Sequence, residues 1–311
     1  MEHLRKSIVR KFILYSFTIA VIESVIDSIF DDGIFPNIPA HGVQEVFTMS
    51  AYIIISLLVF LLFGLLYTRN ISKLIKKEAD RQVNDRNLLF ANIVHDLKTP
   101  ITTILGFSQA LSNGKVKEIE KADVIHSIYE KARGADDLVN RMFQYTKLST
   151  DEYQMHFESQ DVCRILRESV ASQYELFEER NIELELNIPE ERITCALDNM
   201  EFGRALGNLL TNAWKHNARG SKVYISIESE ETKVRILVAD NGKDISRDQE
   251  VTIFDPFICA DDSRNSRNGS GLGLAITKKI IEKHRGAIFI SREIKGYTKG
   301  FVVELPLYGH D

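Results

Sequence analysis

One histidine in this chain has neighbours that suit nucleophilic chemistry. His95 is followed directly by Asp96, by Thr99 one helical turn on, and by Pro100. An acid beside an imidazole can orient the ring and accept its second proton, which leaves the other ring nitrogen a better nucleophile. The proline removes the N–H that would bond the carbonyl of Asp96, so we expect a helix to bend there.

A second set of polar residues lies in the C-terminal half. Asn208 and Asn212 are one turn apart on a predicted helix, and Lys215 and His216 are on the next turn. Paired amides on one helix face can hold a hydrated Mg²⁺ through oxygen, and a nearby lysine can reach a phosphate. Asparagine pairs are common on helices, so this pair alone is weak evidence for a metal and phosphate site. The motifs that follow strengthen it.

Three further motifs come later in the chain. Asp240-Asn241-Gly242 ends a predicted strand, where a carboxylate can accept from an adenine amine and glycine lets the backbone approach the ring, although a plain turn has the same pattern. Phe254-Asp255-Pro256-Phe257 would pin a loop through two aromatic anchors. Gly269-Ser270-Gly271-Leu272-Gly273-Leu274 opens a helix whose N–H groups suit a phosphate. It has neither the Gly-Lys-Ser/Thr of a Walker loop nor the directly preceding strand of a Rossmann turn.

Two amphipathic helices are predicted to position His95. Apolar residues recur at helical spacing over residues 71–112, and a second such run follows Gly114. His95 lies two residues from both Ile93 and Leu97, which places it opposite the apolar stripe and toward solvent. One antiparallel hairpin cannot bury both stripes, so we expect a homodimer that forms a four-helix bundle. The stripes consist of Phe90, Ile93, Leu97, Ile101, Ile104 and Leu111, and of Val124, Ile128, Ala135, Leu138, Met142 and Tyr145.

Mixed helix and strand follows Thr150. Alternating residues predict strands over 182–186, 223–227 and 234–238, and helical periodicity predicts helices over 162–180, 200–217 and 272–283. Strand pairs with separated helices indicate an α+β sandwich with its helices on one face.

Two apolar segments precede the hairpin. Val46 to Tyr67 contains 22 residues without a charge, enough to span a bilayer core of about 30 Å. Phe12 to Phe30 is a weaker span because it carries Glu23 and Asp27 on one helix face. A carboxylate costs about 2.5–3.5 kcal/mol at the membrane centre. These two acids therefore either face a partner helix, a second subunit or water, or include one protonated carboxyl, or lie near the outer interface.

The flanking charges predict the orientation. Before the first segment stand Arg5, Lys6, Arg10 and Lys11, and after the second stand Arg69, Lys73, Lys76, Lys77 and Arg81, whereas residues 31–45 include three acids and no Lys or Arg. By the positive-inside rule both termini are cytoplasmic and the connection is external. About fifteen residues cannot form a ligand-binding domain. We therefore expect sensing within the lipid bilayer or through a partner membrane protein.

Composition excludes several classes of protein. With 311 residues, of which 27% are charged and 44% hydrophobic, the chain is not disordered and has room for two or three modules. A net charge of -5 gives no basic excess for binding nucleic acid. Cys163, Cys195 and Cys259 are widely spaced, which favours buried thiols in a reducing cytosol over a disulfide framework or a zinc site.

The order of these motifs resembles that of bacterial membrane-bound sensor histidine kinases of two-component systems. His95-Asp96-Leu97-Lys98-Thr99-Pro100 is similar to the family's H-box, and the four downstream motifs are similar to its N, G1, F and G2 boxes. The resemblance covers roughly residues 80 to 308. It implies a phospho-acceptor hairpin followed by an ATP-binding domain of the gyrase and histidine kinase type.

The resemblance implies a role for each matching residue. His95 would accept the phosphoryl group, Asp96 would be its general base, and Thr99 would orient a water for phosphatase activity. The other matching residues would bind ATP and Mg²⁺: Asn208, Asn212, Lys215 and His216 at the metal and phosphates, Asp240 and Gly242 at adenine, Gly269, Gly271, Leu272 and Gly273 along the lid, and either Arg264 or Arg267 at the terminal phosphate.

The chain departs from the family pattern in three places. Asp244 stands where the second glycine of the G1 box is usual, which bears on lid flexibility and ATP affinity. His284-Arg285-Gly286 replaces the usual His-Gly-Gly. Too few residues follow Tyr67 for the signalling module often found there, so we expect the membrane helix to run almost directly into the dimerisation helix.

These observations predict a multidomain protein of a bacterial cytoplasmic membrane. Its segments are a cytoplasmic N-terminus (1–11), membrane helices (12–30 and 46–67) joined by an external loop (31–45), a dimerisation and phospho-acceptor hairpin (68–150) and an ATP-binding domain (151–311). The resemblance implies its activity: autophosphorylation of His95 from ATP with Mg²⁺, transfer to an aspartate of a response regulator receiver domain, and phosphatase activity toward that partner.

Two alternatives stay open on the sequence. Asp244 motivates a membrane-tethered ATP-binding regulator that is phosphatase-dominant or has weak kinase activity. A gyrase- or chaperone-like ATPase is disfavoured because Asn208 occupies the usual position of the catalytic glutamate.

Overall fold

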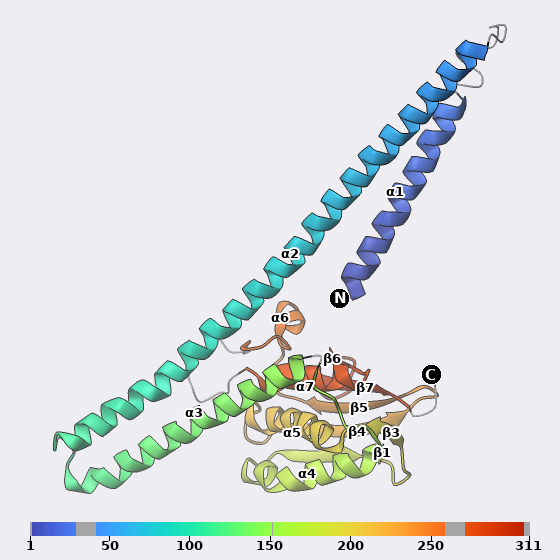
Figure 1. The fold of residues 1–311 in the computed structure, drawn as a ribbon. Coiled ribbons are helices and arrows are strands. Elements are labelled where there is room, and N and C mark those ends of the chain that lie inside the picture. Colours follow the sequence, from blue (N-terminus) through green and yellow to red (C-terminus); the bar gives the residue numbers. More distant parts are fainter. Residues whose placement is uncertain (1, 29–41, 151, 259–270, 308–311) are drawn as a thin grey trace. The chain divides into compact units, whose positions relative to one another are not determined.

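Two units make up the chain, Met1–Leu88 and Leu89–Asp311, and each is considered by itself. The structure, a computed structural model, describes residues 2–28, 42–150, 152–258 and 271–307 (Figure 1).

The first unit contains two long helices, α1 (Glu2–Ser28) and the N-terminal part of α2 (Gly42–Ser112). Aromatic rings join them: Tyr15 lies edge-on to Tyr67 and Phe63, with ring centroids 5.5 and 6.1 Å apart, and Phe12 lies 6.0 Å from Tyr67. The side-chain amide of Asn70 donates a hydrogen bond to the Tyr15 hydroxyl. The two helices thus form a pair held by aromatic packing and one polar bond.

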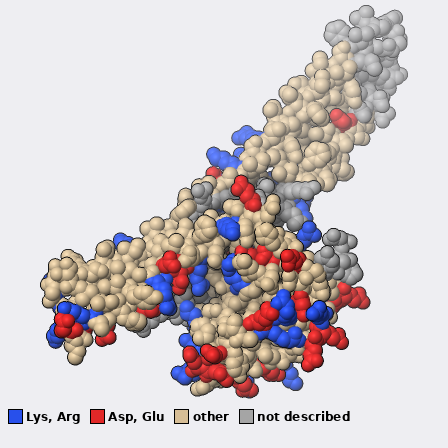
Figure 2. Space-filling view, turned by 60° about the horizontal axis from the view of Figure 1, so that its bottom comes forward, with Lys and Arg blue, Asp and Glu red and all other residues tan. Residues whose placement is uncertain are grey.

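One stretch of the described helices is long and apolar enough to cross a membrane. Ser50–Arg81 has a mean hydropathy of 2.4 in its most apolar part, and none of that part is buried. On the face visible in Figure 2, few charged side chains lie on the upper part of the helical extension. The described part of α1 does not meet the same test of length and composition. One of the two predicted spans is therefore supported.

A helical hairpin begins the second unit. Helix α2 contains Pro100 in its interior and continues to Ser112, and α3 (Lys121–Ser149) runs back along it (Figure 1). Gly114, at φ +65°, ends α2 in the left-handed region, where the Lys115 N–H reaches the Ala110 carbonyl at 3.0 Å. The 3₁₀ turn η2 (Glu118–Glu120) then leads into α3.

Two sheets follow the hairpin. β1 (Glu158–Asp161) pairs antiparallel with β3 (Thr194–Leu197), and a five-stranded sheet has the order β2-β4-β5-β7-β6. Its strands are β2 (Glu183–Asn187), β4 (Lys222–Ser229), β5 (Lys233–Asp240), β6 (Ala287–Ser291) and β7 (Lys299–Pro306). Only the β2–β4 pair of this sheet is parallel. Each predicted strand is present, with ends shifted by three residues or fewer.

Three helices cover one face of the five-stranded sheet. α5 (Asn199–Lys215) packs between α4 (Val162–Glu179) and α7 (Gly273–Lys283), and the short α6 (Arg247–Thr252) follows β5 (Figure 1). Inward residues of β5, such as Val234 and Ile236, alternate with half-exposed Arg235 and Leu237. This alternation is typical of a sheet with one solvated face and agrees with the predicted sandwich.

The segment after α3 is bonded to the α/β domain that follows it. The Lys283 ammonium donates to the carbonyls of Thr150 and Tyr153, both at 3.1 Å. The Tyr153 hydroxyl donates to Glu201 at 2.8 Å, and the His156 N–H donates to Asp198 at 3.0 Å. These bonds hold residues 152–157 against α5 and α7.

Candidate functional site

The His95 imidazole faces solvent. Its side chain is 67% exposed, whereas Ile93 on the opposite helix face is only 4% exposed. The Nδ1 atom lies 3.2 Å from a carboxylate oxygen of Asp96. A carboxylate acceptor at Nδ1 favours the tautomer with its proton there, so the lone pair of Nε2 is the one presented to solvent. Thr99, one turn on, is also exposed.

Asn208 joins α5 to the start of α7. Its amide nitrogen donates to the Gly273 carbonyl at 3.1 Å and to the Thr277 hydroxyl at 3.4 Å. Its amide oxygen accepts no hydrogen bond from the described residues, and the half-buried side chain of Asn212 likewise has no partner among them. Two amide oxygens on one helix face are thus available to a ligand.

The end of α5 carries the other two residues of this motif. Lys215 is the half-buried last residue of the helix, and its carbonyl accepts from Arg180 at 3.2 Å. His216 is the exposed C-cap, and its N–H donates to the Asn212 carbonyl. The cation of Lys215 is thus within one helical turn of the Asn212 amide.

Asp240 and Gly242 meet a residue that the motif search missed. Asp240 is 4% exposed, and one of its carboxylate oxygens accepts the Gly242 N–H at 3.0 Å. A Cβ on Gly242 would come 1.7 Å from the amide oxygen of Asn217, whose amide nitrogen donates to the Ala213 carbonyl at 2.7 Å. Close packing therefore requires a glycine at position 242. The residue that packs against it is Asn217, one turn beyond Ala213.

The aromatic motif closes a loop as predicted. Phe254 is buried against Phe301, with ring centroids 6.2 Å apart, and the Phe257 N–H donates to the Gly271 carbonyl at 3.1 Å. A Cβ on Gly271 would lie 2.8 Å from the Phe257 backbone, and Gly271 has φ +63°. The side chain of Leu272 is fully buried, so only its backbone is available to a ligand.

Four residues singled out in the sequence lie outside the described part of the chain. They are Cys259, Arg264, Arg267 and Gly269. The other two cysteines, Cys163 and Cys195, are buried free thiols, and burial raises the pKa of each.

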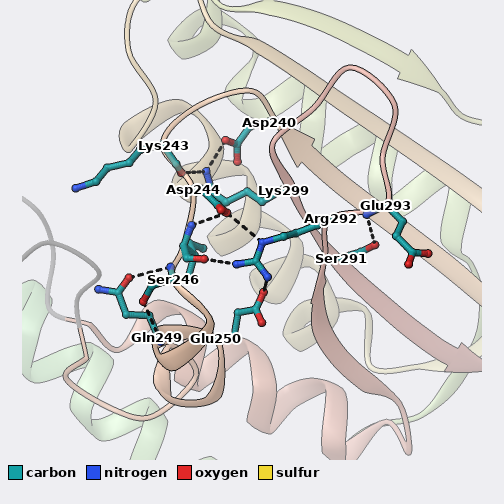
Figure 3. A network of polar contacts seen from close by, with 11 residues as sticks. Asp240, Lys243, Asp244, Ser246, Gln249, Glu250, Ser291, Arg292, Glu293 and Lys299 are labelled. Atoms are coloured by element: carbon teal, nitrogen blue, oxygen red, sulfur yellow. Dashed lines mark hydrogen bonds and ion pairs between the residues drawn. The ribbon is translucent and has the colours of Figure 1, made fainter.

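Asp244 has a defined place in a polar network (Figure 3). Its carboxylate accepts the Ile245 N–H at 2.8 Å and lies 3.3 Å from Nε of Arg292. Arg292 also bonds to Glu250 and to the Ile245 carbonyl. The Asp244 side chain thus holds the backbone at residues 244–245 in place, which a glycine at this position could not do.

We expect Asp244→Gly to have a small effect on nucleotide binding. The Asp244 side chain is 53% exposed, and such partly solvated ion pairs contribute about 1 kcal/mol or less. The KM for ATP should change by less than about threefold. Steady-state labelling at increasing ATP concentrations measures this KM. A KM lowered tenfold or more in Asp244→Gly would contradict the prediction and show that Asp244 impairs ATP binding.

His284 is a buried neutral imidazole. Its Nε2 accepts the Asp198 N–H at 3.0 Å, and its Nδ1 donates to the Ile280 carbonyl at 2.7 Å. Phe157 and Phe202 pack against the ring at 5.2 and 5.8 Å. Burial lowers the pKa of His284 below its ordinary value of 6.5, although the nearby Asp198 and Glu201 carboxylates act in the opposite direction.

This imidazole predicts a pH dependence of stability. A lowered folded-state pKa means that His284 contributes fully above pH 6.5 and that the contribution is lost as the pH falls below that value. The pKa of Asp198 is also lowered, despite its burial, by the His156 and Glu201 N–H groups, but its loss begins only below pH 3.8. We expect a lower Tm at pH 5 than at pH 7.5 and a smaller difference in His284→Gln. Equal pH differences in both proteins would contradict this assignment.

The donor set fits a nucleotide with a divalent cation. Asn208 and Asn212 offer amide oxygens, which hard cations such as Mg²⁺ accept as ligands. Gly242 packs against Asn217 beside the Asp240 carboxylate, which offers an acceptor at the end of the strand. The described residues therefore supply amide oxygens on α5 and a carboxylate at the end of β5.

Comparison with known proteins agrees with this geometry. Residues 85–151 match the family described as His Kinase A (phospho-acceptor) domain, and residues 197–309 match the family described as histidine kinase-, DNA gyrase B-, and HSP90-like ATPase. The chain is 34% identical to sensor protein GtcS of Aneurinibacillus migulanus over 69% of its own length, and 30% identical to sensor histidine kinase WalK of Bacillus subtilis over 73%.

A solved complex has the same fold. The crystal structure of histidine kinase ThkA with response regulator protein TrrA superposes with a TM-score of 0.59 at 24% identity and covers 76% of this chain and 67% of that one. The chain spans 59% of the length of GtcS and 38% of that of WalK. A phospho-acceptor domain followed by this ATPase domain places the chain in the family of sensor histidine kinases.

Proposed function

We propose that the protein phosphorylates itself on His95 from ATP and passes the phosphoryl group to an aspartate of a response regulator. The observation that carries the proposal is the solvent-facing His95 imidazole, paired through Nδ1 with Asp96, on a hairpin joined to a histidine kinase-type ATPase domain.

The proposed reaction uses Nε2 of His95 as the nucleophile. Its lone pair attacks the γ-phosphorus, the bond from phosphorus to the β,γ-bridging oxygen breaks, and ADP leaves with that electron pair. Asp96 holds the Nδ1 proton and stabilises the positive charge that develops on the ring. Catalysis then consists chiefly of positioning the imidazole in line with the leaving oxygen.

The ATP site is proposed at α5 and the end of β5. Asp240 and Gly242 would bind adenine, and Asn208, Asn212, Lys215 and His216 would hold the phosphates and Mg²⁺. Mg²⁺ would neutralise charge on the phosphates when bound. Gly271, Leu272 and Gly273 would line the phosphate end with backbone N–H groups at the start of α7.

The active form is proposed to be a homodimer. Large apolar side chains on the hairpin are exposed in the single chain, which a soluble surface does not favour. These are Phe90, Val94, Ile101 and Leu105 on α2, and Ile125, Tyr129, Val139 and Phe143 on α3. A second copy would cover these exposed side chains in a four-helix bundle.

A response regulator receiver domain is the proposed partner. The complex of ThkA with TrrA supports a partner of this kind for a chain of the same fold. Thr99, exposed one turn from His95, is proposed to orient the water for phosphatase activity toward that partner.

The protein is proposed to lie in a bacterial cytoplasmic membrane with two spans and both termini in the cytoplasm. Apolar side chains on α1, such as Phe12, Leu14 and Phe17, are exposed, and α1 pairs with α2 through aromatic rings. Both observations support α1 as a membrane span in addition to α2. The basic residues at both ends of the pair support this orientation.

The test is phosphotransfer profiling with the full-length protein in detergent micelles. After incubation with radiolabelled ATP and Mg²⁺, the chain should carry acid-labile label, and one or few purified receiver domains of the host should remove it within seconds. Absence of label on the kinase, under conditions in which ATP binds, would overturn the proposal.

A further inference from the structure

Lys299 makes a contact with Asp240 that no predicted motif contains. We infer that Lys299 is a specificity-determining residue of the nucleotide site, which holds Asp240 so that one carboxylate oxygen is reserved for the exocyclic amine of adenine. The inference rests on the proposed ATP site and assigns a role to a residue outside its motifs.

The pair is buried at the start of β7. Lys299 faces Asp240 across the β5–β7 ladder, and its Nζ lies 2.6 Å from one carboxylate oxygen, Oδ1. The two side chains are 10% and 5% exposed. A charge pair this far from solvent is held tightly, and removing one partner leaves the other uncompensated.

The two oxygens of Asp240 have different surroundings. Oδ1 accepts from both Lys299 and the Gly242 N–H at 2.6 and 3.0 Å. Oδ2 accepts from none of the described residues, yet it is not among their fully buried atoms without a partner. Oδ1 is thus bonded twice within the protein, and Oδ2 is an acceptor that the described residues leave unused.

The same ammonium fixes the backbone beside this acceptor. Its second donated bond goes to the Lys243 carbonyl at 2.6 Å, immediately after Gly242 (Figure 3). An ammonium has three donors. Two of those of Lys299 connect the Asp240 carboxylate to the backbone at Lys243, beside the proposed adenine position. Lys299 fixes the direction of Oδ2 and the path of residues 242–243 together.

Arg292 supports the next part of the same segment. It bonds to Asp244, Glu250 and the Ile245 carbonyl, as described above, with its side chain 32% exposed. The segment from Asp240 to Glu250 is therefore held by two cations from the β6–β7 region, of which Lys299 is the buried one.

Oδ2 of Asp240 is held in one direction and can only accept a hydrogen bond. It therefore favours a base that presents an amine over one that presents a carbonyl oxygen. Adenine presents a donor at position 6, whereas hypoxanthine presents a carbonyl oxygen that would face the anionic Oδ2. Sites built to bond a substrate N–H reject analogues that lack it, because the buried acceptor is left unpaired. Wild-type protein should therefore use ATP in strong preference to ITP.

The experiment compares ATP and ITP as phosphoryl donors to the full-length protein in detergent micelles, with phosphohistidine measured by immunodetection. Lys299→Met should raise the KM for ATP about tenfold, equivalent to about 1.4 kcal/mol, while kcat stays within about twofold. The KM for ITP should change much less, so the ATP-to-ITP preference should fall about tenfold.

Lys233→Met is the matched control. Lys233 is also an ion-paired lysine of the sheet, with its Nζ 2.8 Å from Glu304, but it lies at the opposite end of the β5–β7 ladder. Its removal should leave both KM values unchanged. Thermal unfolding of each variant reports on folding, and Lys299→Gln provides a second variant of similar length.

The outcomes separate this inference from the proposed function. Equal losses for ATP and ITP in the Lys299 variants would make the lysine merely structural, and a wild-type protein that uses both nucleotides equally would overturn the inference without any variant. Failure of wild-type protein to form phosphohistidine from ATP would instead count against the proposed function.

Discussion

Replacing His95 by glutamine is expected to abolish autophosphorylation. The imidazole is solvent-facing and carries a free lone pair at Nε2, and a glutamine amide has no comparable nucleophile. Incorporation of label from ATP should fall below about 1% of the wild-type level, because no other group can replace the nucleophile. Since the side chain is exposed, the Tm should stay within about 1 °C.

His126→Gln is the control for this experiment. His126 is an exposed histidine on α3 of the same hairpin, so its replacement changes the composition equally. The variant should label normally. Persistence of acid-labile label in His95→Gln would show that another residue is the acceptor.

Replacing Gly242 by alanine should have the second largest effect, on nucleotide binding. The new Cβ would lie 1.7 Å from the Asn217 amide oxygen and 3.1 Å from an Asp240 carboxylate oxygen. Asn217 is 6% exposed and bonded to α5, so it can yield only by losing that bond. The affinity for ATP should fall about 10- to 100-fold, equivalent to about 1.4–2.8 kcal/mol, as measured by calorimetry with a non-hydrolysable analogue.

Gly203→Ala is the matched control. Gly203 lies inside α5, and a Cβ there would meet nothing within 4 Å. Alanine should stabilise the helix by up to about 1 kcal/mol and leave the ATP affinity unchanged. Unchanged affinity in Gly242→Ala would mean that the base does not approach this turn.

The strongly patterned elements could be predicted from the sequence. Helix α4 begins at Val162 as predicted, because Asp161 caps it through the Cys163 N–H at 3.0 Å and an apolar stripe follows. Strands β4 and β5 alternate clearly, and their ends lie within one or two residues of the predicted ends. The exposed position of His95 followed from helical geometry alone, because both its apolar neighbours are two residues away.

Short strands and long-range partners could not be predicted in the same way. β1 and β3 have four residues each, too few to establish a period, and their pairing spans a whole helix. Nothing in the sequence indicated a role for Lys299, because a lysine at the start of a strand ordinarily has its side chain in solvent. Its meaning depends on Asp240, 59 residues earlier, which only the sheet register brings alongside.

The bonded segment after α3 limits how the ATPase domain can reorient. Lys283 and Glu201 attach Thr150 and Tyr153 to that domain, so these two residues move with it as long as the bonds hold. A short connection restricts the directions from which this domain can approach the hairpin and raises the effective concentration of a bound γ-phosphate at a His95 imidazole within its reach. Flexible residues inserted just before Glu152 would therefore slow phosphorylation by dilution, with every catalytic group still present.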